Sequence, residues 1–284
     1  MVAGHARRLR ARVIIDEHNL EWELLQRSAQ RAPTRLRRVF NQRESDTLRR
    51  VELATLGKAD LVVVTSERER AIVENLLPKT TVAVAPNGVD TSAFSPQGAS
   101  AEIPGRIVYT GAMDYHPNEQ AALMFAEQCW SAIRSARPDA TWYSVGANPP
   151  ASIWRLAELP GVTVTGAVPE TRSYLAAAQV TLAPLLVGGG TRLKILEALA
   201  MGKAMVSTSI GCEGLALTPG EHLLVADGPQ AFAQAVIDTL NDANLRAQLG
   251  AAGRDAVERG YGWERSGRAL QAAIEALLVP ASPR

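Results

Sequence analysis

The residues best suited to chemistry lie in a glycine-rich segment in the second half of the chain. Residues 188–190 are three glycines, which allow the backbone to approach a ligand closely. Arg192 and Lys194 follow, and they open a predicted helix whose free N–H groups and positive dipole end favour an anion. The segment therefore predicts a diphosphate site, with Glu197 one turn further on to accept hydrogen bonds from sugar hydroxyls. A plain glycine-rich turn with a surface arginine and lysine is the other interpretation.

Three further glycine loops follow predicted strands of the same half. They begin at Gly111 and Gly146 and span Gly166 to Val168. Parallel sheets bind ligands at the carboxyl ends of their strands, so these loops are expected to complete the site. The candidate binding residues are Gly111, Gly146, Val168, Gly189, Gly190, Thr191, Arg192, Leu193, Lys194 and Glu197.

Alternating strands and helices must position these loops. Short apolar runs predict strands at 106–110, 141–145, 162–165, 180–183, 204–207 and 222–225. Helical segments lie between them, and three more helices are predicted from Pro229 onward. Continuous apolar strands separated by helices are typical of a parallel sheet that is covered on both faces. We therefore predict an α/β fold whose second part is a complete, doubly wound Rossmann-like domain.

The first part of the chain predicts a smaller sheet. Strands are expected at 13–15, 61–65 and 81–85, with a long arginine-rich helical stretch over 31–56. Ser66 followed by Glu69 is the pattern of a capping box. A stretch rich in proline and glycine then predicts a linker. The expected domains are a partial N-terminal domain at 1–95, a linker at 96–105, a second domain at 106–262 and a closing helix at 263–284.

Composition and charge exclude several classes of protein. The net charge of +1 excludes strong attraction of the whole chain to nucleic acid. Positive charge is nevertheless concentrated in residues 1–60, which hold 13 basic and 8 acidic residues. Two distant cysteines, Cys129 and Cys212, predict reduced, buried thiols in a cytoplasmic protein. The histidines have no metal-ligand spacing, and no metal is expected.

The run from Gly188 to Thr208 resembles the donor-site signature of family-four glycosyltransferases of the GT-B fold. Pro86 to Asp90 and Ala59 to Ser66 also resemble segments of that family, in the same order. The loop from Asp114 to Asn118 is similar to that of sugar transferases from bacterial exopolysaccharide systems. Because the family has further βα units at its start, the resemblance implies a truncated N-terminal, acceptor-side domain.

The resemblance also implies roles for individual residues. Glu197 would bind the ribose hydroxyls, the backbone from Thr191 to Lys194 would bind the diphosphate, and Gly166 to Val168 would frame the base. His18 matches a histidine that faces the transferred sugar, although a loop histidine without a role is an equal interpretation. The predicted catalytic residues are His18, Arg192 and Lys194.

The sequence departs from the family at two places. Gly189 stands where the family has a glutamate that contacts the sugar, and the segment from Gly111 to Asn118 lacks the family's arginine and lysine. We hypothesise that Arg192 and Lys194 replace that pair, because a departing diphosphate needs positive charge.

These observations predict a glycosyltransferase, retaining by resemblance, that uses a nucleotide sugar as donor substrate and no separate cofactor. Its acceptor would be a glycan or a lipid-linked molecule. One rival is a nucleotide-sugar epimerase of the same fold. The other is a truncated or divergent nucleotide-binding chain that needs a partner. The arginine-rich segment 27–50 predicts either a solvated helix or peripheral contact with the cytoplasmic face of a membrane.

Overall fold

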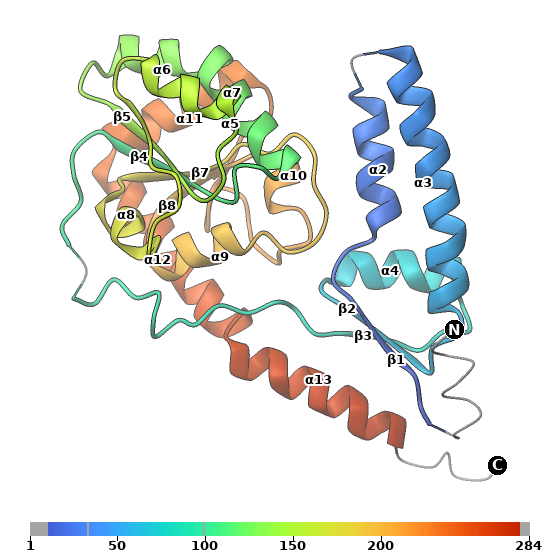
Figure 1. Cartoon of the computed structure of the whole chain (residues 1–284). Helices are drawn as coiled ribbons and strands as arrows, with labels where there is room; N and C mark the ends of the chain where they lie inside the picture. The colour runs from blue at the N-terminus through green and yellow to red at the C-terminus, as the bar shows by residue number, and fades with distance from the viewer. Residues whose placement is uncertain (1–10, 33, 99, 279–284) are drawn as a thin grey trace. The chain divides into compact units, whose positions relative to one another are not determined.

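The computed structural model describes residues 11–32, 34–98 and 100–278, which form two compact units (Figure 1). Unit 1 contains the described residues up to Gly88, the segment Val187–Thr191 and those from Trp263. Unit 2 contains Val89–Leu186 and Arg192–Gly262. Each unit is built on its own parallel sheet, so the predicted α/β class is confirmed.

Unit 2 is built on a six-stranded, fully parallel sheet with the order β6-β5-β4-β7-β8-β9. Its strands are β4 (Arg106–Thr110), β5 (Thr141–Val145), β6 (Val162–Val164), β7 (Val180–Ala183), β8 (Ala204–Ser207) and β9 (Leu224–Val225). Helices cover both faces of this sheet (Figure 1). They are α5 (His116–Gln128), α6 (Trp130–Ala136), α7 (Ala151–Trp154), the 3-10 helix η1 (Arg155–Glu158), α8 (Arg172–Ala177), α9 (Leu193–Ala200), α10 (Ser209–Cys212), α11 (Pro229–Asn241) and α12 (Ala243–Gly260).

Two apolar cores fill the space between this sheet and its helices. Ile107 and Tyr109 of β4 point into the core that α5, α6 and α11 complete. Val108, between them, points into the other core, with α8, α9 and α12. Alternate residues of a strand face opposite sides, so strands with a core on each side are largely apolar along their length. This explains why the strands were recognisable as continuous apolar runs.

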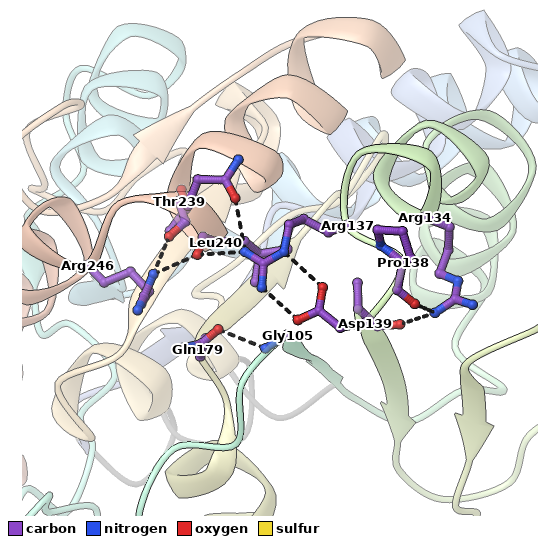
Figure 2. A network of polar contacts seen from close by, with 11 residues as sticks. Gly105, Arg134, Arg137, Pro138, Asp139, Gln179, Thr239, Leu240 and Arg246 are labelled. Carbon is purple, nitrogen blue, oxygen red and sulfur yellow. Dashed lines mark hydrogen bonds and ion pairs between the residues drawn. The ribbon is translucent and has the colours of Figure 1, made fainter.

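Arginines tie the amino-terminal end of this sheet together (Figure 2). Arg137, which follows α6, pairs with Asp139 at 2.7 Å and donates to the carbonyl oxygen of Leu240 at 3.1 Å. Arg246 donates to the carbonyl oxygens of Thr239 and Leu240, each at 2.9 Å. These guanidinium groups satisfy the last carbonyls of α11, where a positive charge is favourable. This end of the sheet is therefore closed by structural contacts, whereas the glycine loops lie at the other end.

Unit 1 contains a three-stranded parallel sheet, β1-β2-β3, with strands β1 (Ile14–Glu17), β2 (Leu61–Val64) and β3 (Val82–Val84). Its helices are α2 (Glu21–Gln30), α3 (Arg35–Leu56), α4 (Glu67–Leu76) and α13 (Trp263–Leu278). Three helices were predicted from Pro229 onward. They are α11 and α12 of unit 2 and α13 of unit 1, so this prediction is confirmed. Ser66 accepts a hydrogen bond from the Glu69 N–H at 3.2 Å, so the predicted cap of α4 is confirmed too.

Three local predictions are corrected. The strand expected to end at Ile15 continues through Glu17, because Asp16 and Glu17 still pair with Val63 and Val64 of β2. The long helix begins at Arg35, where the Thr34 hydroxyl caps it by accepting from the Arg37 N–H. Cys129 is buried as predicted, whereas Cys212 is only half-buried. In the described part of the chain, no helix is long and apolar enough to cross a bilayer.

Candidate functional site

The strand β4 marks the point where the connections of the six-stranded sheet change direction. The chain passes from β4 outward through β5 to β6, and then returns to β7 on the other side of β4. In open parallel sheets, ligands bind beyond the carboxyl ends of the strands at this point, because the loops from neighbouring strands diverge there. The candidate site of unit 2 is therefore expected where Gly111 follows β4 and where α9 begins after β7.

Two glycines bring the loops after β4 and β5 into close contact. The Gly111 N–H donates to the Val145 carbonyl at 3.0 Å, and the Met113 N–H donates to the Ala147 carbonyl at 2.8 Å. Gly146 has a φ of +153°, and a Cβ built on it would lie 1.7 Å from the carbonyl oxygen of Gly111. Only glycine fits this approach. The predicted residues Gly111 and Gly146 thus form one rigid turn at the end of the sheet.

The ammonium group of Lys194 lies directly against this turn. Its Nζ donates to Oδ1 of Asn118 at 2.7 Å and to the Tyr109 hydroxyl at 3.2 Å, and it lies 4.3 Å from the centre of the Tyr109 ring. A Cβ on Gly111 would lie 2.9 Å from the same Nζ. Lys194 comes from the first turn of α9, so the positive end of that helix and the β4 loop meet at one ammonium group.

Asn118 and Tyr109 hold this lysine in place. The Asn118 amide donates to the carbonyl of Ala112 at 2.9 Å, which fixes the orientation of its Oδ1. The buried Tyr109 hydroxyl donates to that Oδ1 at 3.1 Å. Burial raises the pKa of Tyr109, so the phenol stays protonated and acts as a donor. Tyr109 was not predicted to belong to the site, and Asn118 was included only as the end of the loop that begins at Gly111. A tyrosine within a buried strand was the available signal, because its hydroxyl needs a partner.

Lys194 is poised to change its charge near neutral pH. Burial, reinforced by the positive charge of Arg192, lowers its pKa from the ordinary value to about 7, and the carboxylate of Glu197 opposes that shift. An anion placed beside Nζ would favour the charged form and raise this pKa.

The other predicted residues of this segment lie at the start of α9 or within its first two turns. Arg192 is the residue before the helix, is buried, and donates to the carbonyl of Ile210 at 3.4 Å. Leu193 is exposed. Glu197 lies three residues after Lys194 and therefore on the same face of the helix. Burial raises the pKa of the Glu197 carboxyl, and the charge of Lys194 lowers it.

The loop after β6 contains the residues predicted to frame a base. Gly166 has a φ of +68°, and a Cβ on it would lie 3.4 Å from the ring of Trp154. Val168 is half-buried against the core that α8 and α9 share. The turn at Gly166 therefore directs the chain past an indole that remains 47% exposed.

Four predicted residues belong to unit 1. His18 is exposed, and its Nε2 lies 3.2 Å from a carboxylate oxygen of Asp16. Gly189, Gly190 and Thr191 group with unit 1 as well. A Cβ on Gly189 would lie 2.1 Å from Oδ1 of Asn19, so the Asn19 side chain would have to move to admit a side chain at this position. Gly190 has a φ of +65°, which favours glycine.

Comparisons with known families match both parts of the chain. Residues 104–242 match the family described as Glycosyl transferases group 1. Residues 1–93 match the family described as Glycosyltransferase Family 4. Among curated proteins, the chain is 30% identical over 118 residues to a D-inositol 3-phosphate glycosyltransferase of Paenarthrobacter aurescens. The match covers 39% of this chain and 28% of that protein.

A second curated relative is an uncharacterized 44.6 kDa protein of the cps region of Klebsiella pneumoniae, 42% identical over 55 residues. That match covers 19% of this chain and 14% of that protein. The matched regions thus span less than a third of the length of both curated relatives.

Solved structures show the same fold. Sucrose-phosphate synthase from Thermosynechococcus elongatus superposes with a TM-score of 0.76 at 21% identity, over 98% of this chain and 72% of that one. HepE from Anabaena, solved with UDP and glucose, superposes with a TM-score of 0.67 at 14% identity, over 97% of this chain and 74% of that one. At such identities these likenesses establish the fold alone.

Proposed function

The chain belongs to the family-four glycosyltransferases of the GT-B fold, and we propose that it transfers a sugar from a nucleoside-diphosphate sugar to a hydroxyl group of its acceptor. We propose that the acceptor is a glycan or a lipid-linked molecule and that the anomeric configuration is retained. One observation carries the proposal for the donor site. The Lys194 ammonium is held at the switch point of the six-stranded sheet, against Gly111, by Asn118 and Tyr109.

This arrangement suits a diphosphate leaving group. The charge that develops on the departing diphosphate is stabilised best by donors already fixed in position. Lys194 is such a donor, and the first N–H groups of α9 add a partial positive charge beside it. Family members normally carry an arginine and a lysine after the strand equivalent to β4. In this chain Lys194 supplies a positive charge at that strand end from a different element, which supports the replacement predicted from the sequence.

For the remaining residues we propose the roles that the family resemblance implies. Glu197 would accept hydrogen bonds from the ribose hydroxyls, and the loop from Gly166 to Val168 would frame the base. Arg192 would contribute positive charge from its buried position. The contact of His18 with the transferred sugar stays a prediction. Holding donor and acceptor together in the reactive orientation would supply much of the remaining acceleration.

Removing the Glu197 carboxylate is expected to weaken nucleotide binding. A hydrogen bond to a carboxylate contributes about 1.5–3 kcal/mol, so the loss of one such bond in Glu197→Ala should lower the affinity about 10- to 150-fold. Calorimetric titration with UDP, GDP and their sugars measures this loss and identifies the base. Glu127→Ala is the matched control, because Glu127 is exposed near the end of α5. If the folded chain binds none of these nucleotides, the donor-site proposal is wrong.

Nucleotide affinity is also expected to depend on pH. The pKa of Lys194 is about 7 in the free protein and should rise when a diphosphate binds. Binding then takes up a proton, so affinity is highest below pH 7 and falls by up to about tenfold per pH unit above it. Calorimetry in two buffers of different ionisation enthalpy measures the proton uptake directly. A Lys194→Met variant should bind weakly and show neither the uptake nor the slope.

A further inference from the structure

One tryptophan of unit 2 presents its ring to solvent. Trp154 is the last residue of α7 and is 47% exposed, whereas Trp130 and Trp142 are buried and lie against Phe125. Within the described part of the chain, no aromatic ring and no cationic side chain lies over the Trp154 indole. Single exposed apolar residues are common on protein surfaces, so the position of this ring decides whether it is significant.

The contact with Gly166 places the indole at the carboxyl end of the six-stranded sheet. Gly166 follows the last residue of β6 by two residues. A Cβ built on it would lie 3.4 Å from Cζ2 and Cη2, on the outer edge of the six-membered ring of Trp154. Gly166 has no side chain to cover that ring, and its φ of +68° favours glycine. The exposed ring therefore lies at the end of the sheet where ligands bind.

The strand order sets the distance between this ring and Lys194. The Lys194 ammonium lies at the end of β4, against Gly111, and β5 alone separates β4 from β6. Neighbouring strands are about 4.8 Å apart, so the ends of β4 and β6 are about 10 Å apart. In a nucleoside diphosphate, the ribose and the first phosphate separate the base from the terminal phosphate by a comparable length. A ligand whose diphosphate lies at Lys194 can therefore place its base at Trp154.

We propose that Trp154 is the stacking platform for the nucleobase of the donor. This proposal rests on the nucleotide-sugar function proposed above and adds a residue to its base subsite. Every base has a π face, so stacking on the indole contributes affinity without choosing among bases. The choice of base then falls to hydrogen bonds from the loop that follows Gly166. A sugar ring can also stack on an indole, but the transferred sugar is attached to the terminal phosphate, at the opposite end of the donor from the base.

Calorimetric titration of Trp154 variants with UDP, GDP and pyrophosphate tests this proposal. Trp154→Ala should raise the dissociation constant of each nucleotide that the wild type binds about 5- to 150-fold. The factor should be similar for each such nucleotide, because stacking does not distinguish the bases. Trp154→Phe keeps an aromatic ring and should recover most of the affinity. Pyrophosphate has no base, so the wild type and Trp154→Ala should bind it equally.

Tryptophan fluorescence gives a second readout, with a matched control in the other unit. Trp154 and Trp263 are the exposed tryptophans of the described residues, at 47% and 54%, and the other tryptophans are buried. A base stacked on Trp154 should quench its emission. Saturating nucleotide should therefore lower the emission of the wild type and of Trp263→Phe by the same amount, and that of Trp154→Phe much less.

Three results would overturn the stacking role of Trp154 while leaving nucleotide binding in place. Trp154→Ala could bind nucleotides as the wild type does. It could lose affinity for pyrophosphate to the same extent as for nucleotides, in which case the loss comes from a disturbed site. The emission of Trp154 could respond to nucleotide sugars and not to nucleotides, in which case the ring holds the sugar. If the wild-type chain binds no nucleotide, the function proposed above fails, and this role fails with it.

Discussion

A Gly146→Ala variant is expected to unfold at a much lower urea concentration than the wild-type chain. The new methyl group would lie 1.7 Å from the carbonyl oxygen of Gly111, which is a backbone atom and cannot rotate away. The residue would also have to keep a φ of +153°, a conformation that alanine rarely adopts. The loops after β4 and β5 would have to separate, breaking the hydrogen bonds that join them.

The expected loss is large relative to the stability of an ordinary domain. Backbone strain costs about 1–3 kcal/mol, and overpacking in a close-packed region costs about 1–3 kcal/mol more. Natural domains are stable by only about 5–15 kcal/mol. We therefore expect Gly146→Ala to destabilise unit 2 by about 2–6 kcal/mol. Urea unfolding followed by circular dichroism measures the shift of the midpoint.

Two other glycines serve as controls for this variant. Gly228 has a φ of +85°, but a methyl group added to it would have no neighbouring atom within 4 Å, so Gly228→Ala isolates the backbone strain. Gly260, in the last turn of α12, has neither a close neighbour nor a positive φ, so Gly260→Ala should leave stability nearly unchanged. A loss for Gly146→Ala no larger than that for Gly228→Ala would show that the close approach of the two loops has no energetic weight.

Much of the six-stranded sheet could be predicted from the sequence because its central strands are buried on both faces. The strands at 106–110, 141–145, 180–183 and 204–207 were predicted with the bounds that the structure shows. The first strand was predicted to end early, since a carboxylate pair normally marks a loop. Asp16 and Glu17 remain in the strand because backbone pairing with β2 does not depend on side-chain type, and both side chains are partly or fully exposed.

The candidate site could be predicted only where local sequence determines it. Glycine loops and the start of a helix are local features, so Gly111, Gly146 and Lys194 were identified. The contacts that hold Lys194 are not local. Asn118 and Tyr109 lie 76 and 85 residues away in the chain, and the sheet order alone brings them together. Sequence patterns also treated Arg192 and Lys194 as equivalent, whereas the structure buries Arg192 at the start of α9 and places the Lys194 ammonium against Gly111.

Replacing Lys194 by methionine is expected to abolish most of the affinity for nucleoside diphosphates. Methionine keeps the length and apolar contacts of the side chain but removes the ammonium that faces Gly111. A charged hydrogen bond to phosphate contributes about 1.5–3 kcal/mol, so the dissociation constant should rise about 10- to 150-fold. The affinity for the nucleoside without phosphates should not change, because the lost contact is to phosphate. Calorimetric titration of both ligands measures the difference.

Lys203 is the matched control, since it is another lysine of the same unit whose ammonium is held by a neighbouring side chain. Its ammonium pairs with Glu102 at 3.0 Å, and the residue directly precedes β8, at the opposite end of the sheet from the glycine loops. Lys203→Met should lower stability, because it leaves a carboxylate without its partner, yet it should bind nucleoside diphosphates as the wild type does. If both variants lose affinity equally, the effect of Lys194 comes from folding. If neither does, the diphosphate lies elsewhere and the replacement of the family's basic pair by Lys194 is wrong.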